Sequence, residues 1–479
     1  MRTISLTGAL LLFAGCATIR PHAGFTDVER LVGARAPQEI RWNQGDGPDG
    51  EVAARTSALL AGELTADSAV QVALLNNRKL QAVYEKLGIA AADLVQAGLP
   101  PNPIVSADVR FGIGAAGTGA DLGLVQEFVR ILQIPLRKRV AGAAFEVAKL
   151  EVAQAVLDVA SQVKVAFYRL QGSLETLGLR RTVSSAAALS AELAGRQHEA
   201  GNSSSLDLST EQALAEEASI DLAQAESDAQ LDREELARLL GVPSEDGGWR
   251  VAPLLPALPQ QELAPGGLEA LAVAQRLDLA AARQGGEVLA RTIELTRFYG
   301  LFPEGGTGVA SQREVEGGVW SLGPAIDLPI PIFDQRQALA ASQQAQLRQA
   351  REQLAALELV VRSEVRREGA RLVAARLRAE RYQKVLLPLR RRITEETQRH
   401  YNAMQLGLFQ LLAVKRDEID AGRAYISALT DYWIARSELE RAVGGELQVA
   451  RPLDRQPWPA QPGGGSAAAA TEAHHHHGG

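Results

Sequence analysis

Apolar and polar side chains alternate along two stretches of the chain, one in each half of the sequence. In the first, "PIVSADVRFGI", five apolar residues share one face: Val105, Ala107, Val109, Phe111 and Ile113. The polar residues between them face the other way, and a period of two is that of a β-strand with one apolar side. A glycine-rich turn and a second alternating run follow, and the second half repeats this arrangement less regularly. We therefore predict two β-hairpins, at about 103–130 and about 306–330.

Two longer segments repeat their apolar residues every seven positions, which is the spacing of helices that pack as coiled coils. The first seam is Val156, Val163, Leu170 and Leu177, and the second is Val365, Leu372, Ala379, Leu386 and Ile393. We predict one helix from Pro135 to His198 and a matching helix from Pro331 to Tyr401, longer by one heptad, so that both seams stay in phase. Pro388 lies inside the second helix and is expected to bend or interrupt it.

The chain is a duplication, because each half reads as a helix, a hairpin, a very long helix, a glycine-bearing break and a returning helix. "LARLLGVP" at 236–243 matches "LERAVGGE" at 439–446. Thr65 is the expected N-cap of the first helix, which runs toward Gly98. We assign the first repeat to residues 61–248 and the second to residues 249–450. The predicted fold class is mainly α, with four β-strands contributed by two hairpins.

The beginning of the chain carries a candidate export signal. Arg2 precedes a short apolar run that ends in "FAGC", where small residues stand directly before the only cysteine, Cys16. This resembles a bacterial lipoprotein signal peptide over residues 1–15, after which the Cys16 sulfur carries a lipid; the alternative is an ordinary secretory signal with an incidental cysteine. Residues 16–60 are rich in Gly, Pro and charge and are predicted to form an irregular, lipid-anchored tether.

Charge and chemistry narrow the classes of function. The formal net charge of -7 gives no basic surface for nucleic acid, and the single cysteine excludes an intrachain disulfide framework. No catalytic triad, paired-carboxylate helix motif or phosphate-binding glycine loop is present, so we expect neither an enzyme nor a cofactor.

The tail, residues 451–479, is predicted to be a disordered Pro/Gly/Ala/His segment. It ends in four adjacent histidines, His474, His475, His476 and His477. Neighbouring imidazoles can bind zinc, copper or nickel, and an appended purification tag has the same appearance.

Four motifs in this order resemble the TolC-like outer-membrane efflux family over roughly residues 60–450: "QAGLPPNP", "LPIPIFDQRQ", "YNAMQLGLFQLL" and "LERAVG". The resemblance implies a homotrimer in the cell outer membrane, in contact with its lipid, with a twelve-stranded β-barrel continued by a coiled-coil helical barrel in the periplasm. It also implies two protein partners, a periplasmic adaptor and an inner-membrane pump. Pro135, Pro329 and Pro331 would lie at the junctions where a barrel strand passes into a tunnel helix.

In that family the helix breaks at the periplasmic tips narrow the tunnel and contact the adaptor. They correspond here to residues near Gly201 and Asp207 and, in the second repeat, to Gly407 and Gln410. Both glycines are expected to permit the tight reversal. Asp207 either forms a cation-favouring ring in the trimer or caps the returning helix.

The resemblance extends to the branch of the family that exports cobalt, zinc, cadmium and copper, so the predicted cargo is metal cations. Two alternatives stay open within the same fold, a drug-efflux channel and a type I secretion duct. An alternative of another class is a periplasmic coiled-coil scaffold lipoprotein that transports nothing.

Overall fold

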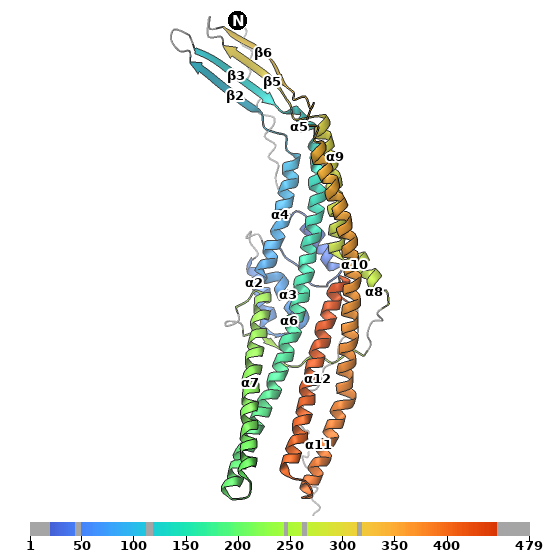
Figure 1. The fold of residues 1–479 in the computed structure, drawn as a ribbon. Helices are drawn as coiled ribbons and strands as arrows, with labels where there is room; N and C mark the ends of the chain where they lie inside the picture. The colour runs from blue at the N-terminus through green and yellow to red at the C-terminus, as the bar shows by residue number, and fades with distance from the viewer. Residues whose placement is uncertain are drawn as a thin grey trace, which may run out of the picture.

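The computed structural model describes residues 20–43, 49–111, 118–243, 248–260, 266–313 and 319–447. The molecule is elongated, with a β-sheet at one end and two helical hairpins that reach the other end (Figure 1). Between them lies a wider middle region, where the shorter helices pack against the long ones.

The four predicted strands form one antiparallel sheet in the order β2-β3-β5-β6. Their bounds are β2 Ile104–Phe111, β3 Thr118–Gln126, β5 Gly306–Arg313 and β6 Trp320–Asp327. The two hairpins meet where β3 pairs with β5, for example at Leu124 and Val309. Gly308 lies so close to the backbone of β3 that a Cβ there would overlap the Leu124 carbonyl oxygen. The sheet therefore joins the two repeats side by side.

The helices of the first repeat are α3 Ala66–Asn76, α4 Arg78–Gly98, α5 Phe128–Leu132, α6 Ile134–Glu199 and α7 Ser205–Leu240. Thr65 caps α3 as predicted, since its hydroxyl accepts from Ser68 N at 3.1 Å. The helix is not continuous to Gly98, because Asn77 ends α3 and caps α4. The Asn77 amide also donates to the Leu239 carbonyl at 2.8 Å, which ties this break to the end of α7.

The second repeat consists of α8 Leu268–Gln275, α9 Leu277–Leu301, α10 Gln337–Arg381, a π-helical turn Tyr382–Leu386, α11 Leu387–Asn402 and α12 Leu408–Val443. Arg276 breaks α8 from α9 and donates to the Ala442 carbonyl at 3.2 Å. This contact matches that of Asn77, although the side chain is different. Gly241 and Gly444 end α7 and α12 in the same left-handed conformation.

The first long helix is continuous over 66 residues. Its predicted seam is buried, with Val156, Val163 and Leu170 fully covered and Leu177 nearly so. At about 1.5 Å per residue the helix spans roughly 100 Å. The apolar core follows this seam as a long strip.

The second seam changes register. Val365, Leu372 and Ala379 are buried as predicted, but Leu386 and Ile393 are exposed and Leu387 is buried instead. A π-helical turn holds one more residue than an α-turn, so the buried face moves on by one position.

The predicted extra heptad in the second long helix is wrong. Equivalent strands of the two repeats begin at Ile104 and Gly306, and the helices that return from the tips begin at Ser205 and Leu408. The stretch from strand to returning helix is therefore longer in the second repeat by a single residue, which is the residue that the π-turn adds.

Pro388 follows the π-turn directly and lies in the first turn of α11. Proline has no N–H to donate to the preceding turn, and the wider π-turn accommodates that loss. The predicted interruption at Pro388 is therefore confirmed.

The two strand-to-helix junctions differ. Pro135 occupies the first turn of α6, where a missing N–H costs nothing. Pro329 and Pro331 instead lie in a segment without regular structure, and α10 begins only at Gln337, not at Pro331 as predicted. Arg336 precedes α10 with a φ of 59° and its guanidinium stacks over Tyr299 at 4.6 Å, which holds this longer junction against α9.

Residues 20–61 correct the expectation of an irregular tether, since they contain α1 Phe25–Gly33 and α2 Asp49–Ala61. Phe25, Val28 and Val32 of α1 are buried against the core, and Trp42 follows them. Their spacing of three and four residues is that of an apolar helix face, a signal masked by the surrounding Gly and Pro. Further on, β1 Glu63–Leu64 pairs in parallel with β4 Arg250–Val251.

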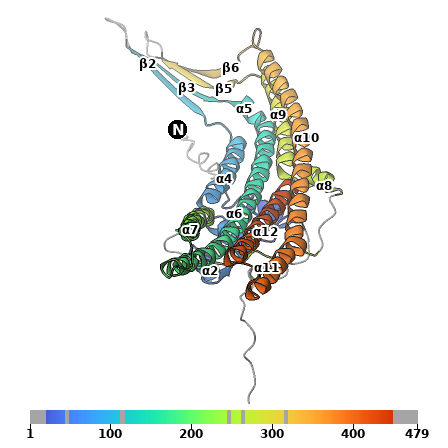
Figure 2. The same ribbon diagram turned by 60° about the horizontal axis from the view of Figure 1, so that its bottom comes forward.

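The long helices lie side by side in the order α7, α6, α12 and α10–α11, along a curve that Figure 2 shows from a second direction. The outer members of this row are therefore α7 on one side and α10–α11 on the other. Within the described ranges, no helix is both long enough and apolar enough to cross a membrane.

Candidate functional site

The candidate site is the pair of turns at the helical tips. In the first turn, Gly201 adopts a φ of 75° beyond the end of α6. Its N–H donates to the His198 carbonyl at 2.8 Å, and Asn202 N donates to the Gln197 carbonyl at 2.8 Å. These two bonds close a helix end through a left-handed residue, a position that favours glycine. Gly201 therefore has the predicted conformation for the reversal.

Asp207 follows this turn in the first turn of α7 and is half-buried. Its carboxylate accepts from Ser204 N at 3.1 Å and from Ser204 Oγ at 2.7 Å, while Ser204 Oγ accepts from Asp207 N at 3.1 Å. The pair forms a reciprocal cap, which satisfies two backbone donors that the helix leaves open. Asp207 thus acts as a cap within one chain.

The second turn, between α11 and α12, is built alike. Here the left-handed residue is Met404, with a φ of 57°, and its side chain is 94% exposed. Gly407 has a φ of -81° and is the N-cap of α12, so the expected role of this glycine in the reversal is wrong. Gln410 takes the place of Asp207, and its Oε1 accepts from Gly407 N at 3.1 Å.

The histidines at the tips contact residues of the two turns. His198 Nδ1 contacts the Ser203 carbonyl at 3.0 Å, and His400 Nδ1 contacts Gln405 Oε1 at 2.5 Å. Among the described residues, no three His, Cys, Asp or Glu side chains converge on a common point for a metal ion. Cys16 and the histidines at 474–477 lie outside the described residues.

A groove runs between the two helical hairpins above the tips, with α6 and α7 on one side and α12 on the other. Charged side chains line it, including Arg180, which pairs with Asp221 at 2.7 Å, and Lys415, which pairs with Glu418 at 2.9 Å. An open groove between two coiled coils can accept another helix.

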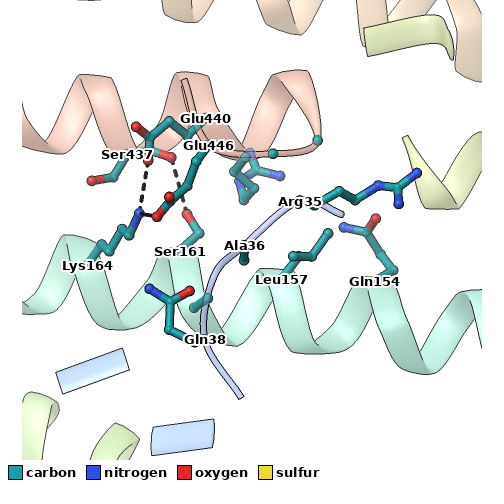
Figure 3. A pocket seen from close by; sticks show the side chains of 14 residues that line it. Arg35, Ala36, Gln38, Gln154, Leu157, Ser161, Lys164, Ser437, Glu440 and Glu446 are labelled. Carbon is teal, nitrogen blue, oxygen red and sulfur yellow. Dashed lines mark hydrogen bonds and ion pairs between the residues drawn. The ribbon is translucent and has the colours of Figure 1, made fainter. Parts of the chain in front are cut away.

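Above the groove lie two buried ion clusters, one between the two repeats and one within the second repeat. In the first, the Lys164 ammonium on α6 contacts Glu440 of α12 at 3.2 Å and Glu446 at 2.5 Å, as Figure 3 shows. Burial works against the charge, but attraction to the two carboxylates is stronger, so the pKa of Lys164 is raised. Glu446 N also donates to the Arg35 carbonyl at 3.0 Å, which holds the N-terminal segment at this junction.

In the second cluster, Glu364 of α10 accepts from Arg276 at 2.5 Å and from Arg441 of α12 at 2.6 Å. Burial alone would raise the pKa of Glu364, but these hydrogen bonds hold it below its ordinary value. Neither cluster was predicted, because the partners are far apart in sequence and no local pattern marks them. The clusters fix the upper parts of the hairpins, while the tips below carry the groove.

The chain is similar to several known proteins. No family model matches the chain. The chain is 24% identical over 394 residues to the cobalt-zinc-cadmium resistance protein CzcC of Cupriavidus metallidurans, covering 80% of this chain and 91% of that protein. Among solved structures, CusC matches with a TM-score of 0.66 at 16% identity, over 80% of this chain and 92% of that one. The CmeC outer membrane channel of Campylobacter jejuni matches with a TM-score of 0.66 at 16% identity, over 87% and 91%.

These neighbours show the fold of the chain, which is that of the TolC-like outer-membrane channels. The fold that the motifs implied is confirmed, with long helices and four strands per chain in one sheet.

Proposed function

We propose that the chain forms the outer-membrane channel of a tripartite efflux system, as a homotrimer that conducts substrates passively to the exterior. The observation that carries this proposal is the four-stranded sheet, which lies at one end of the long helices and exposes large apolar side chains. A conducting role of this kind requires no catalytic group.

The sheet of one chain alone is unfavourable both in water and in lipid. Every residue of β2 is exposed, and large apolar side chains such as Phe111, Leu322 and Ile326 stay uncovered. Among the described strands, β2 and β6 are also the edges of the sheet. In a bilayer each unpaired backbone N–H or C=O group costs several kcal/mol of free energy. Closure of the barrel removes this cost, because it pairs the edge strands. Three copies supply twelve strands and leave no edge.

The tips would form the narrow end of the duct. Three copies of Asp207 around the axis place carboxylates near the entrance, which favours cations, and the capping bond to Ser204 would hold each one in place. The groove between the hairpins is the surface we assign to the periplasmic adaptor, since its charged rim and open form suit a helical partner. An energised inner-membrane pump would supply the cargo.

A lipid at Cys16 is compatible with where the N-terminal helix lies. Asp27 of α1 pairs with Lys149 at 2.8 Å. Along the axis of α6, Lys149 is about 22 Å from the first residue, Ile134, at about 1.5 Å per residue. Residues 21–24 form a turn ahead of α1, so the chain before it, from Cys16 to Pro21, spans at most about 17 Å when extended. This reach is of the same order as the distance to the start of α6.

The anchor is tested by mass spectrometry of the mature chain. The spectrum should show a lipidated Cys16, because the residues before it match a lipoprotein signal. An unmodified thiol at this position would disprove the anchor and leave the channel standing.

The proposed cargo is metal cations. Its support is the likeness to a protein named for cobalt, zinc and cadmium resistance, together with the histidine tail. Deletion of the gene should lower tolerance to zinc, cobalt, cadmium or copper more than tolerance to hydrophobic drugs, and removal of residues 474–477 should have a smaller effect of the same kind. Sensitivity to drugs without sensitivity to metals would refute the cargo and leave the channel standing.

The channel itself is tested on purified protein. Detergent extraction of outer membranes should yield a trimer, and its insertion into a planar bilayer should give discrete conductance steps. A soluble dimer without conductance would instead favour the periplasmic coiled-coil scaffold.

A further inference from the structure

The first strand-to-helix junction carries a cluster of basic side chains. Arg137, Lys138 and Arg139 follow Pro135 closely, in the first two turns of α6. The first turn of this helix has no acidic residue, and within the described part of the chain none of the three basic side chains has an ion-pair partner. The chain as a whole has a formal net charge of -7. The basic cluster, residues 137–139, is therefore an uncompensated patch on an acidic protein.

The sequence around the basic cluster recurs at the opposite end of the molecule, which provides an internal comparison. "PLRKR" at 135–139 is matched by "PLRRR" at 388–392, in α11 near the tips. There Arg390 pairs with Asp417 of α12 at 2.7 Å, so part of the charge is balanced within the chain. The same motif is thus partly compensated at the tips and uncompensated beside the sheet.

The side chains of the basic cluster lean toward the sheet. Helix α6 begins at Ile134 near the sheet and runs away from it toward the tips (Figure 1). Because each Cα–Cβ bond of an α-helix tilts toward the N-terminus, the side chains of α6 point back toward the sheet. The cluster lies about 5 to 8 Å from Ile134 along the helix axis, and the long side chains of Lys and Arg extend this reach. Their charges therefore lie near the level where the strands end.

The basic cluster includes a residue on the outer face of α6. Helix α1 covers α6 at Phe145, where a Cβ on Gly24 at the start of α1 would overlap the aromatic ring. Lys138 precedes Phe145 by seven residues, which is about two turns, so both lie on the same face of the helix. A face that another helix covers does not line an open duct. The exposed Lys138 therefore faces the surroundings of the channel.

Large apolar side chains lie in the short segments between the sheet and the long helices. Leu132 at the end of α5 is 60% exposed, Leu301 at the end of α9 is 73% exposed, and Phe333 in the second junction is 90% exposed. Along the chain, these residues continue the uncovered apolar surface of the strands. Apolar side chains followed by Lys and Arg are typical of a membrane interface, where the former contact acyl chains and the latter contact headgroups.

We propose that residues 137–139 bind the phosphate groups of anionic phospholipid headgroups, in the leaflet on the helical side of the sheet. This inference rests on the proposed membrane channel and adds a ligand to it. Charge complementarity supports it, because each Lys or Arg near an anionic membrane surface strengthens binding by about fivefold. The ligand is a bilayer lipid and not a free anion, because acyl chains cover the neighbouring apolar side chains better than water does.

Native mass spectrometry of the purified full-length protein tests the headgroup preference. The probes are phosphatidylglycerol and phosphatidylcholine with the same acyl chains, since only the former has a net negative charge. The wild-type protein should bind phosphatidylglycerol at least tenfold more tightly, and a higher salt concentration should reduce this preference by screening. Equal affinity for the two lipids would overturn the proposal.

Substitutions locate the preference on the protein. The triple variant R137Q/K138Q/R139Q should lower the preference for phosphatidylglycerol at least fivefold, whereas R137K/R139K keeps the charge and should retain the preference. If the triple variant does not fold, Lys138→Gln alone should still lower the preference about twofold, because this exposed side chain supports no ion pair. No loss in these neutralised variants would refute the proposed site.

The matched control is the triple variant R390Q/R391Q/R392Q, which removes the same charge from the related motif near the tips. It should retain the preference for phosphatidylglycerol, because that motif lies at the end of the molecule far from the sheet (Figure 1). An equal loss in this control would show that net charge, and not the basic cluster at the junction, determines lipid binding.

Two further measurements separate this inference from its alternatives. Inorganic phosphate at the concentration of the lipid should not displace phosphatidylglycerol, and displacement would assign the basic cluster to a soluble anion instead. A wild-type protein that conducts in planar bilayers but shows no headgroup preference would refute the lipid site and leave the channel standing. A wild-type protein that conducts in bilayers of neither lipid would refute the proposed channel itself.

Discussion

Replacement of Lys164 by methionine should destabilise the chain strongly. Only 13% of the Lys164 side chain and 13% of the Glu440 side chain are exposed, and the two ions lie 3.2 Å apart. At an effective dielectric constant near 20 their attraction is about 5 kcal/mol before desolvation is counted. Glu446 is 34% exposed, so its contribution is discounted for solvent screening. Because removal of one partner leaves a buried carboxylate uncompensated, we expect a loss of about 3 kcal/mol.

The assay is urea unfolding of the purified protein in detergent, followed by circular dichroism at a fixed protein concentration. The control is Lys384→Met, which removes the contact of an exposed lysine with the half-buried Glu380 at 3.7 Å and should cost less than about 1 kcal/mol. The triple variant with Glu440→Gln and Glu446→Gln should recover much of the loss, since it leaves no unpaired charge. If Lys164→Met cost no more than the control, the cluster would not stabilise the junction.

The pH dependence has a definite sign. The pKa of Lys164 is raised above its ordinary value of 10.5, so its stabilisation is fully present below about pH 10.5 and is lost as the pH rises through the higher folded value. The difference between wild type and Lys164→Met should therefore not change through lysine titration between about pH 7 and 9. A steep fall within that range would contradict the raised pKa.

Three further predictions concern local geometry. Gly172→Ala should lower the urea midpoint, because the new Cβ overlaps Thr430. Overpacking costs about 1–3 kcal/mol, which exceeds the gain in helix propensity of under about 1 kcal/mol. A second substitution, Thr430→Ala, should partly restore the midpoint. Met404→Gly should stabilise the chain by about 1 kcal/mol and raise the midpoint, since glycine adopts the left-handed conformation without strain, and an unchanged midpoint would refute this. Asp207→Asn can still accept the capping bonds but carries no charge, so single-channel recordings should show reduced cation preference; unchanged selectivity would leave Asp207 a cap only.

Much of the fold could be predicted because its signals are local. The heptad at Val156 and Val163 and the cap at Thr65 each depend on a few neighbouring residues, and the structure confirms them. The strand alternation near Val105 likewise identifies the hairpins. The helix at Phe25 was missed because glycine and proline on either side outweighed a short amphipathic pattern.

The junction contacts could not be predicted in the same way. Lys164 and Glu446 are 282 residues apart, and only the packing of α6 against α12 brings them together. Asn77 and Arg276 make equivalent contacts with different side chains. An alignment of the two repeat sequences therefore does not reveal their shared role. At the tips, left-handed Met404 stands where glycine was expected near Gly407, because a non-glycine residue can occupy that position at a modest energetic cost.

The π-turn at residues 382–386 has a consequence for how a duplicated gene can change. A residue inserted into an uninterrupted α-helix would rotate everything beyond it by about 100°, turning a buried stripe toward water and a charged stripe toward the core. Here the additional residue of the second repeat is confined to a single wide turn, and both tips still end at the same level. The two halves have thus been free to differ in length without losing their shared architecture. Deletion of one residue from this turn should accordingly be tolerated, whereas a deletion from the middle of α6 should not.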